Sequence, residues 1–289
     1  MKIIDNRKKI YILSAVLLLA GLTAILIQGL SGNGYFNLGV EFSGGMSINI
    51  NFEREFDNNE LSELITEITG ETAQVQRMGA TQASIKILSL EPEVRIELID
   101  TICEKYGITE ANIEISDISA TVSGEMQQAA MRAIATASLL MLIYISARFR
   151  GVKTGLAAVI TVLHDALFVV CCYGVLRIPL NNSFIAVILT IIGYAINNNI
   201  VVFDRIRENR GILRRDSFGA IVDKSVNQSF KRCICTTTTT LITITTLYFL
   251  GVPTIKEFSL PIILGLLCGA YSSICFSGSM LYTLTKGKG

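Results

Sequence analysis

Residues 191–209 read IIGYAINNNIVVFDRIREN, an apolar run that ends in a cluster of charged side chains. Followed backwards, the apolar run begins near Phe184, so it covers residues 184–203. An α-helix of about 20 such residues is long enough to cross the roughly 30 Å hydrocarbon core of a bilayer. The sequence therefore predicts a membrane-spanning helix here, with its charged end at one membrane surface.

Five other segments have the same length and apolar character. Of the 289 residues, 51% are hydrophobic and 17% are charged, whereas a soluble domain carries about 25% charged residues. This composition excludes an ordinary cytosolic enzyme, a disordered tail and a nucleic-acid binder with a basic surface. The first span lacks the small-residue cleavage signature of a signal peptide, so we expect an uncleaved span. The five segments are residues 10–30, 129–147, 155–176, 233–252 and 260–281.

The basic residues predict how the six spans are oriented. Lysine and arginine concentrate in the short cytoplasmic loops of membrane proteins. Here they precede the first span and follow the second, fourth and sixth, whereas the opposite short loops carry only Arg177 and Lys256. We therefore expect both termini and a loop of residues 204–232 in the cytoplasm, and the segment between the first two spans outside.

That segment, residues 31–127, is a polar and acidic block. It contains 17 acidic and 5 basic residues, a net charge of −12. Apolar residues alternate with polar ones in some parts of it and recur at helical spacing in others. Strands are expected over residues 46–53, 72–78, 82–88 and 113–122, and helices over 57–70 and 91–106.

The order strand, helix, strand, strand, helix, strand is that of the ferredoxin-like fold. A turn containing Gly79 joins the second and third strands, and a slip in the alternation at Asp117 predicts a β-bulge in the last. The predicted fold is thus an α-helical membrane protein with an α+β extracytoplasmic domain. Its divisions are residues 1–30, the domain of residues 31–127, and residues 128–289.

The cysteines and the single histidine give no sign of a metal centre. Only Cys103 of the seven cysteines lies in the outer block, so that block can form no internal disulfide. The chain has no C-x-x-C and no H-E-x-x-H. We therefore expect no zinc site and no cofactor.

His164 and Asp165 lie near the middle of the third span. Ionisable side chains inside a membrane are costly, so each is a functional candidate. No lysine or arginine lies close to Asp165 in sequence, so this carboxyl must be neutral, hydrated or paired across helices. It could serve in ion transfer, or it could form a hydrogen bond that locks helix packing. His164 could be only the neighbour that orients it.

Asn197, Asn198 and Asn199 interrupt the fourth span. Three consecutive residues cover most of a helix circumference, so at least one amide must face another helix or water. Amides cannot titrate, but they can hold a hydrogen-bond network or present carbonyl oxygens to a cation. Gly193, nearby, permits a close approach between helices.

The fifth span follows Arg232 and holds eight threonines between Thr236 and Thr246. Threonine hydroxyls can bond back to the helix backbone, which makes such a span tolerable. One side of the helix could instead line a hydrated path, and both interpretations stay open at this point.

Together these segments resemble the SecF family, the smaller half of the SecDF protein-export complex. Residues 191–209 are similar to its fourth-span signature, LHD at 163–165 to its third-span motif, and residues 258–273 to its sixth-span motif. GVEFSGG at 39–45 looks like the family's G-x-D-F-x-G-G, with Glu in place of Asp. The motif residues expected to be structural are Gly39, Glu41, Gly44, Gly45, Gly193, Asp204 and Arg205.

The resemblance implies half of an RND-type bundle in a bacterial plasma membrane. Such a subunit pairs with SecD and assists export of translocating polypeptides through the SecYEG channel, using an ion gradient. Its contacts are protein and membrane lipid, with no nucleic acid, and it is not an enzyme. The candidates for the ion path are His164, Asp165, Asn197, Asn198, Asn199 and Arg232.

One departure from the family pattern bears on mechanism. The family reads Asn-Asp-Thr where this chain reads Asn197-Asn198-Asn199, and the family's Asp is implicated in proton transfer. Asn198 cannot carry a proton, although the family's arginine is kept as Arg232. Coupling would then fall to Asp165, to the SecD half, or to another cation.

Three other functions compete with protein export. Half of an RND-like exporter of small molecules or lipids would share the fold, but would want a larger outer region and twelve spans. In a receptor or scaffold the spans would only anchor the outer domain in the membrane. The polar groups inside the membrane argue against this function. An intramembrane protease is disfavoured because no G-x-S-x-G and no second mid-span Asp accompany Asp165.

Overall fold

The computed structural model describes residues 2–70, 74–78, 81–87, 90–149, 151–251 and 253–286. Residues Met1–Asn37 and Met131–Gly289 form one compact unit, and Leu38–Ala130 form another. The turn expected at Gly79 lies outside the described residues.

The first unit is helical, and six helical segments of the chain are long and apolar enough to cross a membrane, as the sequence predicts. The last segment contains a π-helical turn, η3, between α9 and α10, and another such turn, η1 (Gly29–Asn33), follows α1. The helices are α1 (Arg7–Gln28), α5 (Ala120–Phe149), α6 (Val152–Val175), α7 (Asn182–Ile212), α8 (Phe218–Leu250), α9 (Pro253–Tyr271), η3 (Ser272–Phe276) and α10 (Ser277–Lys286).

Residues 204–232, expected from the sequence as a cytoplasmic connection whose second part, 217–232, forms a helix with one apolar face, are mostly helical. α7 continues to Ile212 and α8 begins at Phe218, where the Ser217 hydroxyl caps the helix by accepting a hydrogen bond from the Ala220 N–H. The basic residues of this region are good helix formers. Only residues 213–217 separate the two helices.

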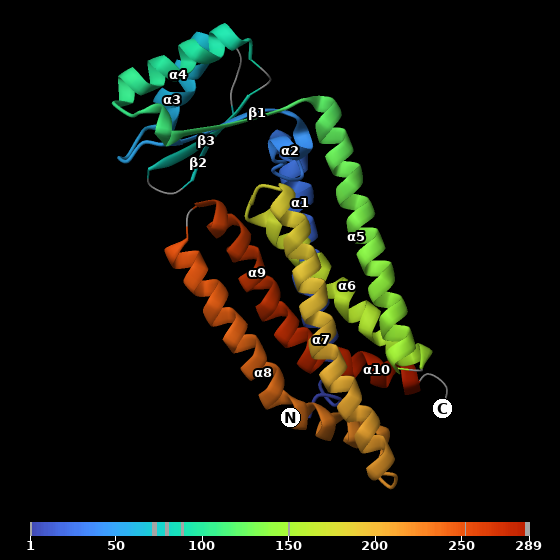
Figure 1. The fold of residues 1–289 in the computed structure, drawn as a ribbon. Coiled ribbons are helices and arrows are strands. Elements are labelled where there is room, and N and C mark those ends of the chain that lie inside the picture. Colours follow the sequence, from blue (N-terminus) through green and yellow to red (C-terminus); the bar gives the residue numbers. More distant parts are fainter. Residues whose placement is uncertain are drawn as a thin grey trace. The chain divides into compact units, whose positions relative to one another are not determined.

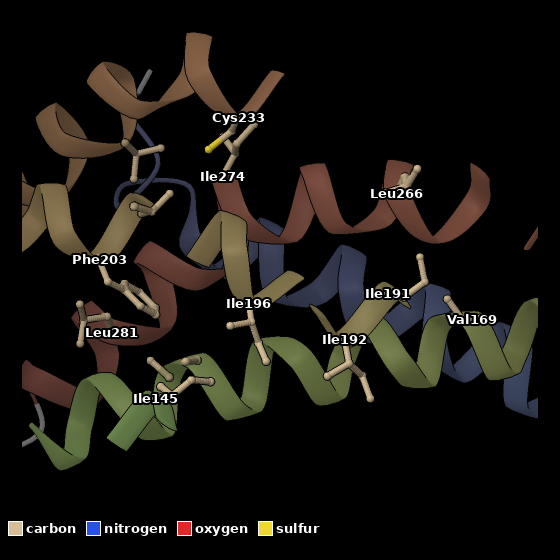
Figure 2. Packing of buried hydrophobic residues seen from close by; sticks show 14 of the residues in the cluster. Ile145, Val169, Ile191, Ile192, Ile196, Phe203, Cys233, Leu266, Ile274 and Leu281 are labelled. Atoms are coloured by element: carbon tan, nitrogen blue, oxygen red, sulfur yellow. The ribbon is translucent and has the colours of Figure 1, made fainter. Parts of the chain in front are cut away.

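The core of this unit is built around α7. Its isoleucines pack against apolar residues of α6 and α9, and Figure 2 shows Ile191 of α7 and Val169 of α6 pointing toward each other. α8 and α9 run side by side (Figure 1). The spans of α6, α7 and α9 are half buried or more, whereas few residues of α1, α5 and α8 are buried. These three helices therefore present apolar surface to lipid or to another protein.

Close helix approach occurs at Gly265 of the sixth span, whereas Gly193, which would permit such an approach, is not in one. A methyl group placed on Gly265 would lie 2.5 Å from Cδ1 of Ile191, which is too short for any real contact. A methyl group on Gly193 would meet only the Met141 side chain, at an ordinary 3.9 Å. Packing between α9 and α7 thus requires glycine at position 265.

The second unit is a four-stranded antiparallel sheet with order β2-β3-β1-β4, and two helices cover one face of it (Figure 1). The order of strands and helices along the chain is the predicted one. The elements are α2 (Val40–Ser43), β1 (Gly45–Asn51), α3 (Asn58–Thr69), β2 (Gln74–Arg77), β3 (Gln82–Ile87), α4 (Pro92–Tyr106), η2 (Glu110–Asn112) and β4 (Ile113–Ile118).

Two residues set the ends of helix α3, and strand β4 differs from the sequence-based expectation. The Asp57 carboxylate caps α3 by accepting from the Asn59 N–H at 2.8 Å, and Gly70 ends the helix at a φ of 68°. The predicted bulge at Asp117 is wrong, because β4 pairs regularly with β1 through Met46 opposite Asp117. The alternation slips because the strand ends at Ile118 and α5 begins at Ala120.

Candidate functional site

The carboxyl group of Asp165 lies at the centre of the helical unit and is fully buried. Three side chains surround it. Ser272 Oγ donates to Oδ2 at 2.7 Å, the Cys268 thiol donates to Oδ1 at 3.7 Å, and His164 Nδ1 lies 3.0 Å from Oδ1. Asp165 and His164 come from α6, whereas Cys268 and Ser272 come from the sixth span. We call these four residues the Asp165 cluster.

The π-helical turn η3 begins at Ser272, the residue that holds Asp165. Single π-helical turns inside longer helices occur frequently at functional sites, because they locally break the regular helical spacing. Ser272 Oγ also lies 3.2 Å from the Gly269 carbonyl oxygen, so its own helix orients it as well. The neighbouring Gly269 places no side chain against the carboxylate.

The His164 ring is buried between Asp165 and an aromatic side chain. It stacks on Phe276 with ring centroids 4.9 Å apart, and its Nε2 has no hydrogen-bond partner among the described residues. A carboxylate and an imidazole in contact can share one proton without creating a net charge in the membrane interior. The pair is therefore chemically able to take up and release a proton, or to bind a cation.

The asparagines of α7 do not join this cluster. Asn198 and Asn199 are buried and Asn197 is exposed. The Nδ2 atoms of Asn198 and Asn199, and Oδ1 of Asn199, have no hydrogen-bond partner in the described part of the chain. Buried amides without partners are unfavourable, so these groups need water or another molecule to satisfy them.

The threonines of α8 form hydrogen bonds within their own helix. Six of their hydroxyls donate to backbone carbonyls three or four residues earlier, as Thr243 Oγ1 does to Thr239 O at 3.1 Å. Of the two interpretations left open, this observation favours the structural one within this chain. Arg232, Thr236, Thr239, Thr243 and Thr246 are exposed and recur at helical spacing, so they form a polar stripe on the outside of α8.

Asp204 and Arg205 connect helices where α7 leaves the apolar region. Arg148 of α5 donates to Asp204 Oδ2 at 2.6 Å. Arg205 donates to Oε1 of Gln228 on α8 at 2.7 Å. These two residues therefore tie α7 to both neighbours, which is a structural role.

The motif at residues 39–45 shapes the start of the second unit. The Gly39 carbonyl accepts from the N–H groups of Phe42 and Ser43 at the start of α2, and Glu41 lies half-buried in this helix. Gly44 and Gly45 have φ angles of 74° and 101°, which favour glycine, and they turn the chain from α2 into β1.

Sequence reasoning named Asp165 and His164 but did not connect them with Cys268 and Ser272. Those two residues lie 103 and 107 positions further along the chain than Asp165. Their spacing of four places Cys268 and Ser272 on the same face of the sixth span, but it does not record which helix that face meets.

Comparisons with known proteins point to one family. The family model described as "Protein export membrane protein SecD/SecF, C-terminal" matches residues 99–287. The protein translocase subunit SecF of Borreliella burgdorferi is 32% identical over 96% of this chain and 95% of its own length. The subunit SecDF of Bacillus subtilis is also 32% identical, over 98% of this chain but 38% of its own length.

A solved structure agrees with these sequence matches. The crystal structure of SecDF, a translocon-associated membrane protein from Thermus thermophilus, superposes with a TM-score of 0.90 and 27% identity. The superposition covers 99% of this chain and 39% of that chain. The chain thus spans about two fifths of the SecDF proteins that it matches.

Proposed function

Because this chain belongs to the SecD/SecF family of protein-export membrane proteins, we propose that it serves export through a buried ion-transfer site at Asp165. It is a multi-pass membrane protein and an auxiliary subunit of Sec protein translocation. Its relatives are named as translocase subunits, which are transport components rather than enzymes.

A SecD-type subunit is the first partner. The SecDF relatives carry this chain's counterpart together with a larger remainder in one protein. The poorly buried surfaces of α1, α5 and α8 and the polar stripe on α8 are what an incomplete bundle would leave for a second half. Asn198 and Asn199, whose amide nitrogens have no partner among the described residues, fit the same interpretation.

The single observation that carries ion coupling is the complete burial of Asp165 in contact with His164, Cys268 and Ser272. A carboxylate at that depth is costly in free energy, and such groups mark ion and proton pathways in membrane proteins. Asn198 cannot take this role, because an amide does not titrate. We assign the ion path to Asp165 and His164, and leave the exposed residues Asn197 and Arg232 to the surface shared with the partner. Asn198 and Asn199 are buried within this chain and carry no part of the ion path in this proposal.

We further infer that residues 31–127 form a ferredoxin-like domain outside the cytoplasm. The β2-β3-β1-β4 sheet with two helices on one face supports this fold, and the net charge of −12 suits a solvated exterior domain. The excess of lysine and arginine in the short loops supports a cytoplasmic position for both termini and for residues 204–232. The domain would act on polypeptides that emerge from a SecYEG channel.

The test is export in cells whose own copy of this gene is replaced by variants. Asp165→Asn keeps the shape of the side chain but cannot carry a proton, so we expect export of a pulse-labelled secreted protein to fall to the level of a deletion strain. Asp100→Asn, in α4 of the second unit, is the matched control and should export normally. Normal export by Asp165→Asn, at normal membrane abundance, would refute the ion-transfer role.

A second test addresses the partners. Purification of the chain from native membranes in mild detergent should recover a SecD-like subunit and SecY. Recovery of neither would argue against the auxiliary role in Sec export and for a divergent exporter, independently of the Asp165 result.

A further inference from the structure

The Asp165 cluster brings together three kinds of metal ligand. His164 Nδ1, a carboxylate oxygen of Asp165 and Cys268 Sγ all lie within 4.8 Å of one another, and all three side chains are buried. Imidazole, carboxylate and thiolate are the groups that bind Zn²⁺ and similar divalent ions in proteins. We propose that these three residues form a binding site for a soft divalent cation of the Zn²⁺ and Cd²⁺ class.

The distances are close to those of a tetrahedral site. Ligand atoms 2.0 to 2.3 Å from a zinc ion lie about 3.3–3.7 Å from one another in that geometry. The distance from His164 Nδ1 to Asp165 Oδ1 is 3.0 Å, and that from Asp165 Oδ1 to Cys268 Sγ is 3.7 Å. The third pair, His164 Nδ1 and Cys268 Sγ, lies within 4.8 Å, so binding would draw these two side chains up to about 1 Å closer together.

The charges also match. On binding, the Cys268 thiol gives its proton to solvent, so the thiolate and the Asp165 carboxylate carry two negative charges. A divalent cation makes the cluster neutral, which a membrane interior tolerates far better than an isolated charge. A monovalent ion would leave one charge uncompensated once the thiol had ionised.

The remaining contacts orient the ligands. Ser272 Oγ holds Oδ2 of Asp165 at 2.7 Å, which leaves Oδ1 directed toward His164 and Cys268. Hydrogen bonds of this kind position metal ligands. Three protein ligands leave a fourth position for water, which is typical of sites that exchange ligands rather than of closed structural zinc sites.

A cation bound in the Asp165 cluster would affect export. This consequence rests on the proposed function. A cation held by Asp165 would occupy the carboxylate assigned to ion transfer. Zn²⁺ bound there would therefore inhibit export, whereas the binding itself does not depend on the export role.

The test uses the purified full chain in detergent, with Co²⁺ as a spectroscopic probe. Cys103 and the exposed Cys235 are first replaced by serine to remove competing thiols. We expect one equivalent of Co²⁺ with the absorption bands of a tetrahedral, thiolate-ligated ion, which Zn²⁺ displaces. Cys268→Ser and His164→Ala should each weaken binding by about tenfold or more, and the first should remove the thiolate band. Cys275→Ser, in η3, is the matched control and should keep both the binding affinity and the thiolate band.

A second measurement leaves the Asp165 cluster unsubstituted, so its result does not depend on how the variants fold. Zn²⁺ should slow alkylation of Cys268 by a membrane-permeant maleimide, while the rate at Cys275 stays the same. Absence of a thiolate band in the parent chain, its survival in Cys268→Ser, or equal alkylation of Cys268 with and without Zn²⁺ would each overturn the proposal.

The two proposals fail separately. If Co²⁺ binds as described but Zn²⁺ leaves export unchanged, the metal site stands and the ion role of Asp165 is refuted. If Asp165→Asn stops export but no metal binds, the ion role stands and the metal site is refuted.

Discussion

Ser272 Oγ donates to Asp165 Oδ2 at 2.7 Å, although the two residues are 107 positions apart in the sequence. This hydrogen bond links the third span to the π-helical turn in the sixth. The Ser272 hydroxyl is also one of the few polar groups that stabilise this carboxylate, which has no solvent exposure. The position of this hydroxyl therefore connects helix packing with the chemistry of the site.

Ser272→Ala should destabilise the chain and slow export. Removing the hydroxyl leaves a buried carboxylate oxygen without a donor, which costs about 1–3 kcal/mol. Thermal unfolding of the purified chain and pulse-labelled export measure the two effects. Ser273→Ala is the matched control, since Ser273 is equally buried but its hydroxyl donates only to the Ala270 carbonyl. Equal losses in both variants would show that Ser272 acts on packing alone.

Asn198→Ala should leave the stability of the isolated chain unchanged or slightly higher. The Asn198 Nδ2 atom is buried without a hydrogen-bond partner among the described residues. Removing the amide therefore removes the free-energy cost of burying that unsatisfied donor. Export should fall less than in Asp165→Asn, because an amide does not titrate and Asn198 is buried within this chain. Thermal unfolding and pulse-labelled export measure these effects. A loss of export as complete as that of Asp165→Asn would return the ion path to Asn198.

Local signals in the sequence predicted much of this fold. Each span is a long apolar run, and the ends of α3 follow from the Asp57 cap and from Gly70. The errors arose where one pattern fits two structures. Apolar residues at 118, 120 and 122 suit a bulged strand, but they also suit a strand that ends before a helix. The continuation of α7 through residues 204–212 was not anticipated, because charged residues after an apolar run suit a loop or a solvated helix equally well.

The site was predictable only in part, for a physical reason. The cost of a charge in the membrane singles out Asp165 and His164 from sequence alone. Cys268 is an ordinary buried residue of an apolar helix until α6 and α9 pack together. No local pattern records which face of α9 meets Asp165, so neither the hydrogen bond from Ser272 nor the group of metal ligands could be anticipated.

The turn from α2 into β1 depends on glycine at position 45. Its φ of 101° lies in a region that side chains with a Cβ avoid. Gly45→Ala should therefore lower the stability of the second unit by about 1–3 kcal/mol, which limited proteolysis of the full chain can report through faster cleavage within residues 38–130. Gly124→Ala, in helix α5 with open space around it, is the control and should not accelerate cleavage. If limited proteolysis cleaved both variants at the same rate, glycine would not be required at position 45.

The packing of α9 on α7 gives a matched pair of glycine substitutions. Gly265→Ala would place a methyl group 2.5 Å from Ile191 Cδ1 and 2.9 Å from Val169 Cγ2, so the two helices or these side chains must move. Such overpacking costs about 1–3 kcal/mol, and we expect a lower unfolding temperature in detergent. Gly193→Ala meets only the Met141 side chain at 3.9 Å and gains helix propensity, so it should be neutral or stabilising by up to about 1 kcal/mol. If Gly193→Ala were instead the more damaging of the two, the close approach would lie at Gly193 on α7.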